Sequence, residues 1–534
     1  MKALLATGAS IMSLGMSAAY AQTDAVPVAT AGSSPQPTAE VSSTEDIVVT
    51  ARARGETLVR VPVAVSSLSP AALERGVATD LTKVAELTPS VIISSTRQTG
   101  GGTIGIRGIS SPANVAGFEQ AVSVALDGVQ TSNGRIAGIG FFDIGQVDVL
   151  RGPQALFFGK NSPAGVISLT SNGPTKDFEV SLGTGYEFVG NEVYLDGTVS
   201  GPISDTLGFR VAVRYRDLDG WMHNDAQPIA NPFYNPATGA PVGAASLPGA
   251  RHDRYGNNEL LGRVTLEYKP TDTLTATLKV FHSRYRDQGP GTASQNIGPC
   301  VGDKPRMYGV VDPYGECKAD NHTSNGDVSP TVGAGVPLTD GTGRSFGKLD
   351  FTSVSGRIVA DLDKVTITSQ TGYNYAKVAS QYGLDHTVYS QLYSGETDSI
   401  KEFSQEIRFT TDLDGALNLA GGVYYQKTDR DYHADVKLND ANYNPIAKRF
   451  DSADILTQQE GRTLSGFGQV LWEVMPEVEF AAGVRYTNER KLDTTTSLYG
   501  FGAFNVANII FPGKRCPAAC LAGSPRITGR PKQR

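Results

Sequence analysis

Long runs of alternating apolar and polar side chains dominate the chain from residue 178 onward. Because successive side chains of a strand point to opposite faces, this alternation predicts strands with one apolar and one polar face. A soluble β-sandwich alternates in the same way, but its strands usually have only about 5–6 residues. We therefore expect a large antiparallel barrel with an apolar outside and a wet interior. The clearest apolar faces are Phe178, Val180, Leu182 and Tyr186; Phe209, Val211, Val213 and Tyr215; and Leu260, Val264, Leu266 and Tyr268.

The connections between these runs alternate in length. Short turns on one side and long polar loops on the other are the arrangement of a transmembrane β-barrel, and about eleven or twelve strands are expected here. The short turns are 201–205, 269–272, 361–363, 412–414 and 473–476, and the long loops are 217–257, 286–350, 378–401 and 428–462.

The N-terminus has the features of a secretory signal peptide. Lys2 precedes an apolar run of small residues, and Ala19 and Ala21 fit the cleavage rule, so the mature chain is expected to begin at Gln22. Residues 22–44 are rich in Thr, Ala, Ser and Pro and predict a flexible linker. No later segment offers the roughly 20 apolar residues of a transmembrane helix.

Composition excludes several functions. The net charge of −7 provides no basic surface, so nucleic acid is not an expected partner. The six His residues form no spaced metal cluster, the chain shows no nucleophile–His–acid set, and Gly-rich 99–103 lacks the Lys-Ser/Thr of a P-loop. We expect neither an enzyme nor a resident cofactor or metal.

Four cysteines form two local pairs, Cys300 with Cys317 and Cys516 with Cys520. An oxidising compartment favours disulfides within such short loops. Zinc is the alternative, but no His lies beside either pair at ligand spacing.

Residues 45–172 predict a compact α+β unit. Ser69 and Asp80 are expected to cap helices that end near Arg75 and Leu87. Short strands are expected at 62–65, 91–93, 103–107 and 123–126, with an Asp-Gly turn at 127–128. Residues 147–170 predict strand, turn, short helix, turn and strand.

The stretch from Val147 to Thr170 resembles the signature that ends the plug domain of TonB-dependent outer-membrane receptors. Upstream, Asp46-Ile47-Val48-Val49-Thr50 resembles the TonB box of that family. The resemblance implies a plug inside an outer-membrane β-barrel, with TonB as partner pulling on the box. It implies uptake of a scarce ligand, by default a ferric siderophore, with cobalamin, glycans and aromatic compounds as alternatives.

The same resemblance implies which residues dock the plug. Arg107 in Ile-Arg-Gly and Arg151 in Leu-Arg-Gly-Pro would face the barrel wall, with Glu402 and Glu406 as candidate partners. The alternative is that both arginines are solvated surface residues. Aromatic and His residues of the long loops suit either ligand capture or packing of the loops on themselves: Trp221, His223, Tyr234, Tyr255, Tyr382, His386, Tyr389 and Tyr393.

Barrels of this family close at 22 strands, so about half a barrel is expected in this chain. The Pro-, Gly- and basic-rich stretch 515–534 does not alternate like a strand, which favours a truncated receptor; a non-functional remnant and a passive porin-like barrel are the rival interpretations. The expected organisation is signal peptide 1–21, linker 22–44, box and plug 45–172, partial barrel 173–514 and atypical tail 515–534.

Overall fold

The computed structural model describes the pairs 48–49 and 56–57 and most of the chain from residue 64 to residue 498. The signal peptide, the linker, Asp46, Ile47, Thr50, Tyr234, Cys516, Cys520 and the tail lie outside the described residues. Within 64–498 the residues not described are 77, 79, 96–101, 112–118, 132, 138, 140, 160, 234–243, 290–294, 308–309, 334–337, 339–340, 439–452 and 476–477.

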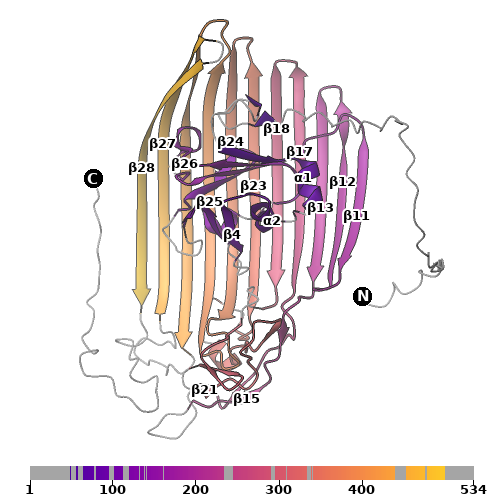
Figure 1. Ribbon diagram of the computed structural model, residues 1–534, viewed down its shortest axis with the longest axis vertical. Helices are drawn as coiled ribbons and strands as arrows, with labels where there is room; N and C mark the ends of the chain where they lie inside the picture. Colours follow the sequence, from indigo (N-terminus) through magenta and orange to yellow (C-terminus); the bar gives the residue numbers. More distant parts are fainter. Residues whose placement is uncertain are drawn as a thin grey trace, which may run out of the picture. The chain divides into compact units, whose positions relative to one another are not determined.

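An 11-stranded antiparallel sheet forms the larger part of the described chain, and its strands follow one another in sequence order (Figure 1). Each strand pairs with its predecessor, so the backbone groups of neighbouring strands form an antiparallel ladder with register shifts near Pro202, Tyr268 and Glu473. The fold expected from the alternation is therefore confirmed. The strands are β11 (Glu179–Glu187), β12 (Glu192–Ser204), β13 (Leu207–Leu218), β17 (Asn257–Thr271), β18 (Leu274–Asp287), β23 (Phe346–Asp361), β24 (Val365–Gly383), β25 (Leu392–Thr411), β26 (Leu417–Leu438), β27 (Ala453–Met475) and β28 (Val478–Leu498).

The later strands are much longer than their sequence pattern indicated. Segments 378–401 and 428–462, which were expected to be loops, lie largely within β24 to β27. At that end both faces carry Ser, Thr, Asp and Gln, which hides the alternation, but pairing with neighbouring strands still satisfies the backbone. Segments 217–257 and 286–350 are mainly loops as predicted, apart from short internal elements, one- or two-residue overlaps with β13, β17 and β18, and a five-residue overlap with β23 at 346–350.

A smaller α+β unit precedes this sheet. Its central five-stranded sheet has the order β3-β9-β10-β7-β8, in which β10 and β7 are parallel. Ser69 and Asp80 cap α1 and α2 as predicted, because their side chains accept hydrogen bonds from the amides of Ala72 and Lys83. The elements are β3 (Ala64–Leu68), α1 (Pro70–Arg75), α2 (Leu81–Glu86), β4 (Val91–Ser95), β5 (Gly102–Ile106), β6 (Ile109–Ser110), β7 (Val122–Leu126), β8 (Val129–Thr131), α3 (Gly134–Ala137), β9 (Ile144–Arg151), α4 (Ala155–Phe158) and β10 (Gly165–Ser171).

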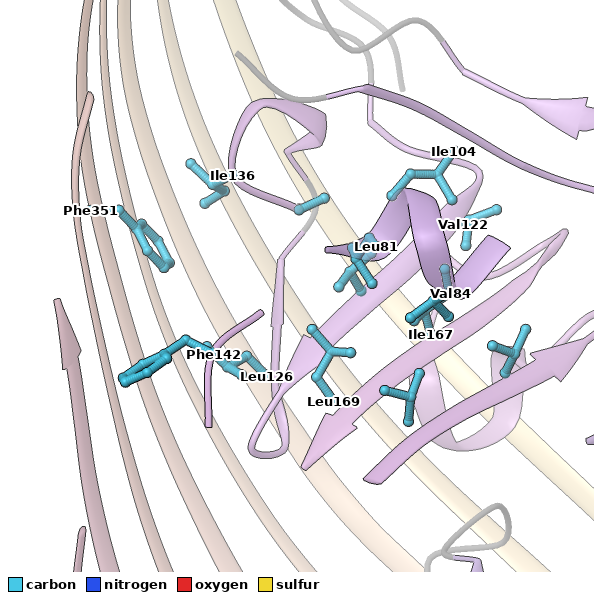
Figure 2. Close-up of a cluster of buried hydrophobic side chains, with 14 of the residues drawn as sticks. Leu81, Val84, Ile104, Val122, Leu126, Ile136, Phe142, Ile167, Leu169 and Phe351 are labelled. Atoms are coloured by element: carbon cyan, nitrogen blue, oxygen red, sulfur yellow. The ribbon is translucent and has the colours of Figure 1, made fainter. Parts of the chain in front are cut away.

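One apolar core joins this unit to the sheet. Leu81 and Val84 of α2 pack with strand residues such as Ile104 and Ile167, and Phe351 of β23 belongs to the same cluster (Figure 2). Burial of these side chains supplies the largest favourable contribution to the packing. None of the helices in the described part of the chain has the length and hydropathy of a membrane span.

The connections at one end of the long strands fold together. Ala226 and Leu247 of loop 219–256 form a buried apolar cluster with Val388 and Tyr389 of loop 384–391. Short elements lie within the loops: β14 (His223–Asn224), β15 (Ile229–Ala230), β16 (Ser246–Leu247), β19 (Cys300–Val301), β20 (Lys304–Met307), β21 (Val310–Val311), β22 (His322–Thr323) and α5 (Pro330–Gly333).

Candidate functional site between plug and sheet

One face of the 11-stranded sheet is apolar and exposed. Leu182 is 79% exposed, Val484 72% and Tyr486 73%, although water disfavours such contiguous apolar surface. The residues that the sequence placed on the apolar faces of the first strands lie on this side, among them Val213 and Leu260. This surface has the character that lipid requires.

The opposite face of the sheet is charged and contacts the α+β unit. Arg263 of β17 is only 1% exposed, and Asp398 of β25 is likewise buried at 1%. Charged groups at this depth are stable only with partners, because burial removes their hydration. Their partners identify how the smaller unit is held.

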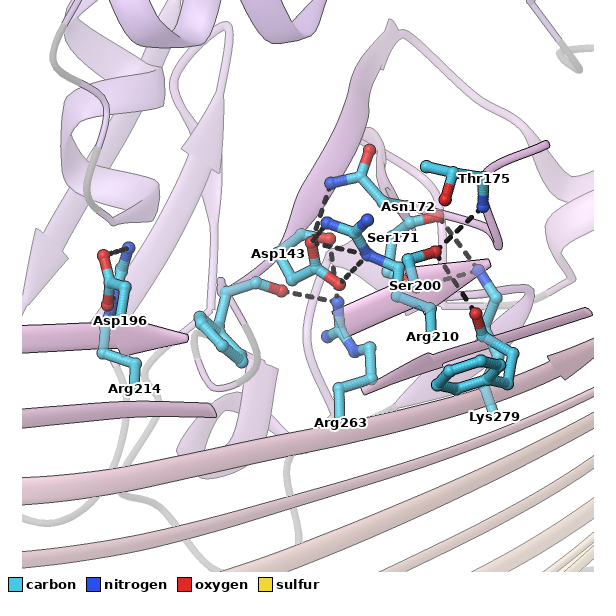
Figure 3. Close-up of polar contacts among 12 residues, drawn as sticks. Asp143, Ser171, Asn172, Thr175, Asp196, Ser200, Arg210, Arg214, Arg263 and Lys279 are labelled. Carbon is cyan, nitrogen blue, oxygen red and sulfur yellow. Dashed lines mark hydrogen bonds and ion pairs between the residues drawn. The ribbon is translucent and has the colours of Figure 1, made fainter. Parts of the chain in front are cut away.

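A first cluster centres on Asp143, which directly precedes β9. Arg210 of β13 binds its carboxylate through Nε and Nη2, with the Nη2–Oδ1 contact at 2.6 Å, and Asn172 donates to it at 2.8 Å (Figure 3). Arg263 donates to the carbonyl oxygens of Phe142 and Asp143. Such two-pronged contacts fix orientation as well as attraction.

A second contact lies beside it at the Asp127–Gly128 turn. Lys279 of β18 binds the Asp127 carboxylate at 2.8 Å and also donates to Ser171. Burial alone would raise the pKa of Asp127, but Lys279 and Arg263 outweigh it and hold that pKa below its ordinary value. The Asp127 carboxylate is therefore kept charged in the docked state.

A third cluster has the opposite polarity. Arg135 of α3 contacts Glu396 at 2.7 Å and Asp398 at 3.5 Å, both on β25. Burial opposes its charge, yet the two carboxylates raise the pKa of Arg135 above its ordinary value. A local hydrogen bond fixes the start of α3, since the Asn133 side chain accepts from the Arg135 amide. No sequence motif singled out Arg135, although a lone charge in an apolar segment was a usable signal.

The structure brings together other docking residues than those expected. Arg107 lies exposed in the β5–β6 turn, and Arg151 donates to Ser66 within the smaller unit itself. Glu402 is buried and accepts from Asn374, while Glu406 pairs with Arg408. Among the described residues neither arginine forms an ion pair with either glutamate. The motifs around Arg107 and Arg151 indicated which unit docks. Which residues form the ion pairs depends on how that unit is oriented against the sheet.

Two other expected sites are partly described. Val48 and Val49 form β1, which pairs with β2 (Glu56–Thr57). Cys300 and Cys317 are joined by a disulfide with a Cα–Cα distance of 6.2 Å. Within the described residues, no group of three or more His, Cys, Asp or Glu side chains could hold a metal ion.

The aromatic and histidine residues of the loops pack mainly against their own surroundings. Tyr389 is 2% exposed, and the hydroxyl of half-buried Tyr255 accepts a hydrogen bond from Asn224. The His322 ring contacts Asp225 and stacks on His223. These contacts agree with packing of the loops on themselves. Ligand capture by these residues stays a hypothesis.

Comparisons with known proteins agree with this architecture. Residues 57–166 match the family model of the TonB-dependent receptor plug domain. A pesticin receptor of Yersinia enterocolitica is 23% identical over 399 residues, which cover 73% of this chain and 47% of the relative. The chain thus spans about half the length of the curated relatives it matches.

Solved structures share the fold at low sequence identity. The pyoverdine outer-membrane receptor of Pseudomonas aeruginosa PAO1 matches with TM-score 0.61 and 14% identity, covering 85% of this chain and 61% of that one. The ferric yersiniabactin uptake receptor of Yersinia pestis matches with TM-score 0.57 and 17% identity, covering 82% and 61%.

Residues 57–166 thus match a TonB-dependent receptor plug domain, and the chain shares the fold of solved TonB-dependent receptors. That family consists of transporters rather than enzymes. The α+β unit is therefore called the plug below.

Proposed function

We propose that this chain serves TonB-dependent uptake of a scarce ligand, with an iron–siderophore complex as the preferred candidate. The observation that carries the proposal is a plug docked on the charged inner face of a lipid-facing sheet through buried, breakable ion pairs. A docked plug closes the route across the membrane, and transport needs work that moves it. Curated relatives are pesticin receptors, and structural neighbours bind pyoverdine or take up ferric yersiniabactin.

The box Asp46–Thr50 is the proposed point at which TonB pulls. An extended segment can add to a sheet edge of a partner, where main-chain hydrogen bonds resist force without special side chains. Proline removes one amide hydrogen, so Val48→Pro should abolish energised uptake, whereas Val48→Ala should keep most of it.

Uptake assays in a strain that lacks its own siderophore receptors test this proposal. The full-length receptor is expressed and supplied with radioactive iron bound to hydroxamate, catecholate or mixed siderophores, with cobalamin as a competitor. We expect TonB-dependent accumulation of iron with at least one of them, and loss to background in Val48→Pro. Cobalamin uptake instead would replace the ligand assignment, and uptake that persists without TonB would contradict the mechanism.

A further inference from the structure

The third docking cluster, called the outer cluster below, is a series of alternating charges that runs from the plug into the sheet. Arg135 contacts Glu396 at 2.7 Å, and it shares Asp398 with Arg430 of β26. Arg430 holds Asp398 more firmly, with two hydrogen bonds of 2.9 and 2.6 Å, whereas Arg135 lies 3.5 Å from it. Tyr382 of β24 donates its hydroxyl to Glu396 at 3.2 Å.

Each carboxylate of the sheet therefore has a second partner within the sheet. If Arg135 moves away, Asp398 keeps both bonds to Arg430 and Glu396 keeps the hydroxyl of Tyr382. An uncompensated buried carboxylate is very unfavourable, so these fallback partners lower the free energy needed to separate the plug.

The Asp127 and Asp143 contacts are built differently. Every hydrogen bond that the Lys279 side chain makes among the described residues goes to plug atoms, on Asp127 or Ser171. The Arg210 guanidinium likewise directs its hydrogen bonds in the described chain to Asp143. Separation there would leave a partly buried cation of the sheet without its described partner.

The outer cluster also lies where the loops meet the strands. Tyr382 is the penultimate residue of β24, and Glu396 follows shortly after the start of β25. Loop 384–391 between them is buried under other loops, with the Val388 amide bound to Asp312 at 3.0 Å. Rearrangement of this loop can therefore reach Glu396 through a few residues of one hairpin.

We propose that Arg135 forms the releasable outer contact of the plug, and that Arg430 and Tyr382 compete with it for Asp398 and Glu396. This proposal rests on plug movement as the proposed function requires it. Arg430 and Tyr382 are thus positioning residues. They keep the carboxylates of Asp398 and Glu396 hydrogen-bonded when α3 detaches, which makes detachment reversible. The contacts at Asp127 and Asp143 hold the plug in place meanwhile.

Competition predicts effects of opposite sign for residues of one network. Arg135→Ala should accelerate hydrogen exchange of amides 129–137 by about tenfold or more, because the contact is lost. Arg430→Gln should slow the same amides by about fivefold, because Asp398 then depends on Arg135 alone. Tyr382→Phe, which keeps the ring, should slow them by about twofold to threefold.

The test is hydrogen exchange with mass spectrometry on the purified full chain in detergent, without ligand or TonB. Lys427→Gln on β26 is the matched control, since Lys427 pairs with Asp429 on an exposed part of the strand, and it should change nothing. Unchanged exchange over 420–426 shows that β26 stays paired in each variant. If Arg430→Gln does not fold, Tyr382→Phe decides alone.

Acceleration by Arg430→Gln or Tyr382→Phe would overturn the proposal, because both would then simply support the docked plug. Unchanged exchange in both variants would overturn it as well. The exchange measurement does not depend on transport. If Arg135→Ala accelerates exchange and Arg430→Gln and Tyr382→Phe slow it, but no iron uptake is found, only the proposed function is refuted.

Discussion

The early and late parts of the plug are held in different ways. From Glu119 onward, the plug meets the sheet through the ion pairs of Asp127, Arg135 and Asp143, and Lys491 lies 3.4 Å from Glu119. Among the described plug residues before Glu119, no ion pair or hydrogen bond to the sheet is found. That part relies on apolar side chains such as Leu73 in the shared core.

If the plug is pulled from its N-terminus, as proposed above, this difference decides which part detaches first. Apolar contacts weaken gradually as surfaces slide, whereas a buried ion pair resists until its charges separate. Strand β3 is moreover an edge strand, paired with β9 alone in its sheet. We expect force at the box to detach the early part first, while the late part stays against the sheet.

The largest expected effect comes from the late part. Asp143→Ala leaves the partly buried Arg210 guanidinium without its carboxylate and should destabilise docking by about 3–5 kcal/mol. Urea titration of the purified receptor, followed by exchange of amides 141–172, measures this loss. Asp177→Ala, at a position outside these contacts, is the control. A loss below about 1 kcal/mol would contradict the importance of this ion pair.

A smaller effect is expected at the turn between β7 and β8. Gly128 has φ +81°, and a Cβ there would lie 2.8 Å from the Gln370 side chain of the sheet. Gly128→Ala should therefore cost about 1–2 kcal/mol of docking, from left-handed strain and this close approach. The same titration tests it. Gly128→Ala with Gln370→Ala should recover part of the loss; no recovery would show that the strain alone matters.

The early part should respond only locally. Asp80→Ala removes the cap of α2 and should cost about 1 kcal/mol, and Ser69→Ala about 0.5–1 kcal/mol at α1. Exchange should rise over 70–87 and stay unchanged over 122–171. Faster exchange in both ranges would show that the two parts are one cooperative unit, which would break the comparison.

The smallest expected effect is a weakening of docking at acid pH, which depends on the Asp127 carboxylate. Because the folded pKa of Asp127 lies below its ordinary value of 3.8, its contribution is present above that value and is lost as pH falls through the lowered pKa. Docking of the late part should thus weaken below about pH 4. Comparing the acid profile of exchange over 122–131 in wild type and Asp127→Asn measures this. Identical profiles would rule out Asp127 as the titrating group.

Much of the architecture was readable from local patterns. The alternation in β11, β13 and β17 predicted strands and their apolar faces, and Ser69, Asp80 and the Asp127–Gly128 turn predicted local geometry. These features depend on neighbours in sequence, so the chain itself encodes them. The longer ends of β24 to β27 escaped prediction because both of their faces are polar there.

Docking partners could not be found in this way. Arg107 and Arg151 were expected to meet Glu402 and Glu406, yet Arg135, Asp127 and Asp143 make the contacts to Glu396, Lys279 and Arg210. Partners separated by 67 to 261 residues are set by the register of the sheet and the orientation of the plug. The sequence by itself determined a plug followed by lipid-facing strands. Only the tertiary structure decided which charges fasten them together, because an ion pair needs two groups that packing brings within contact distance and shields from water.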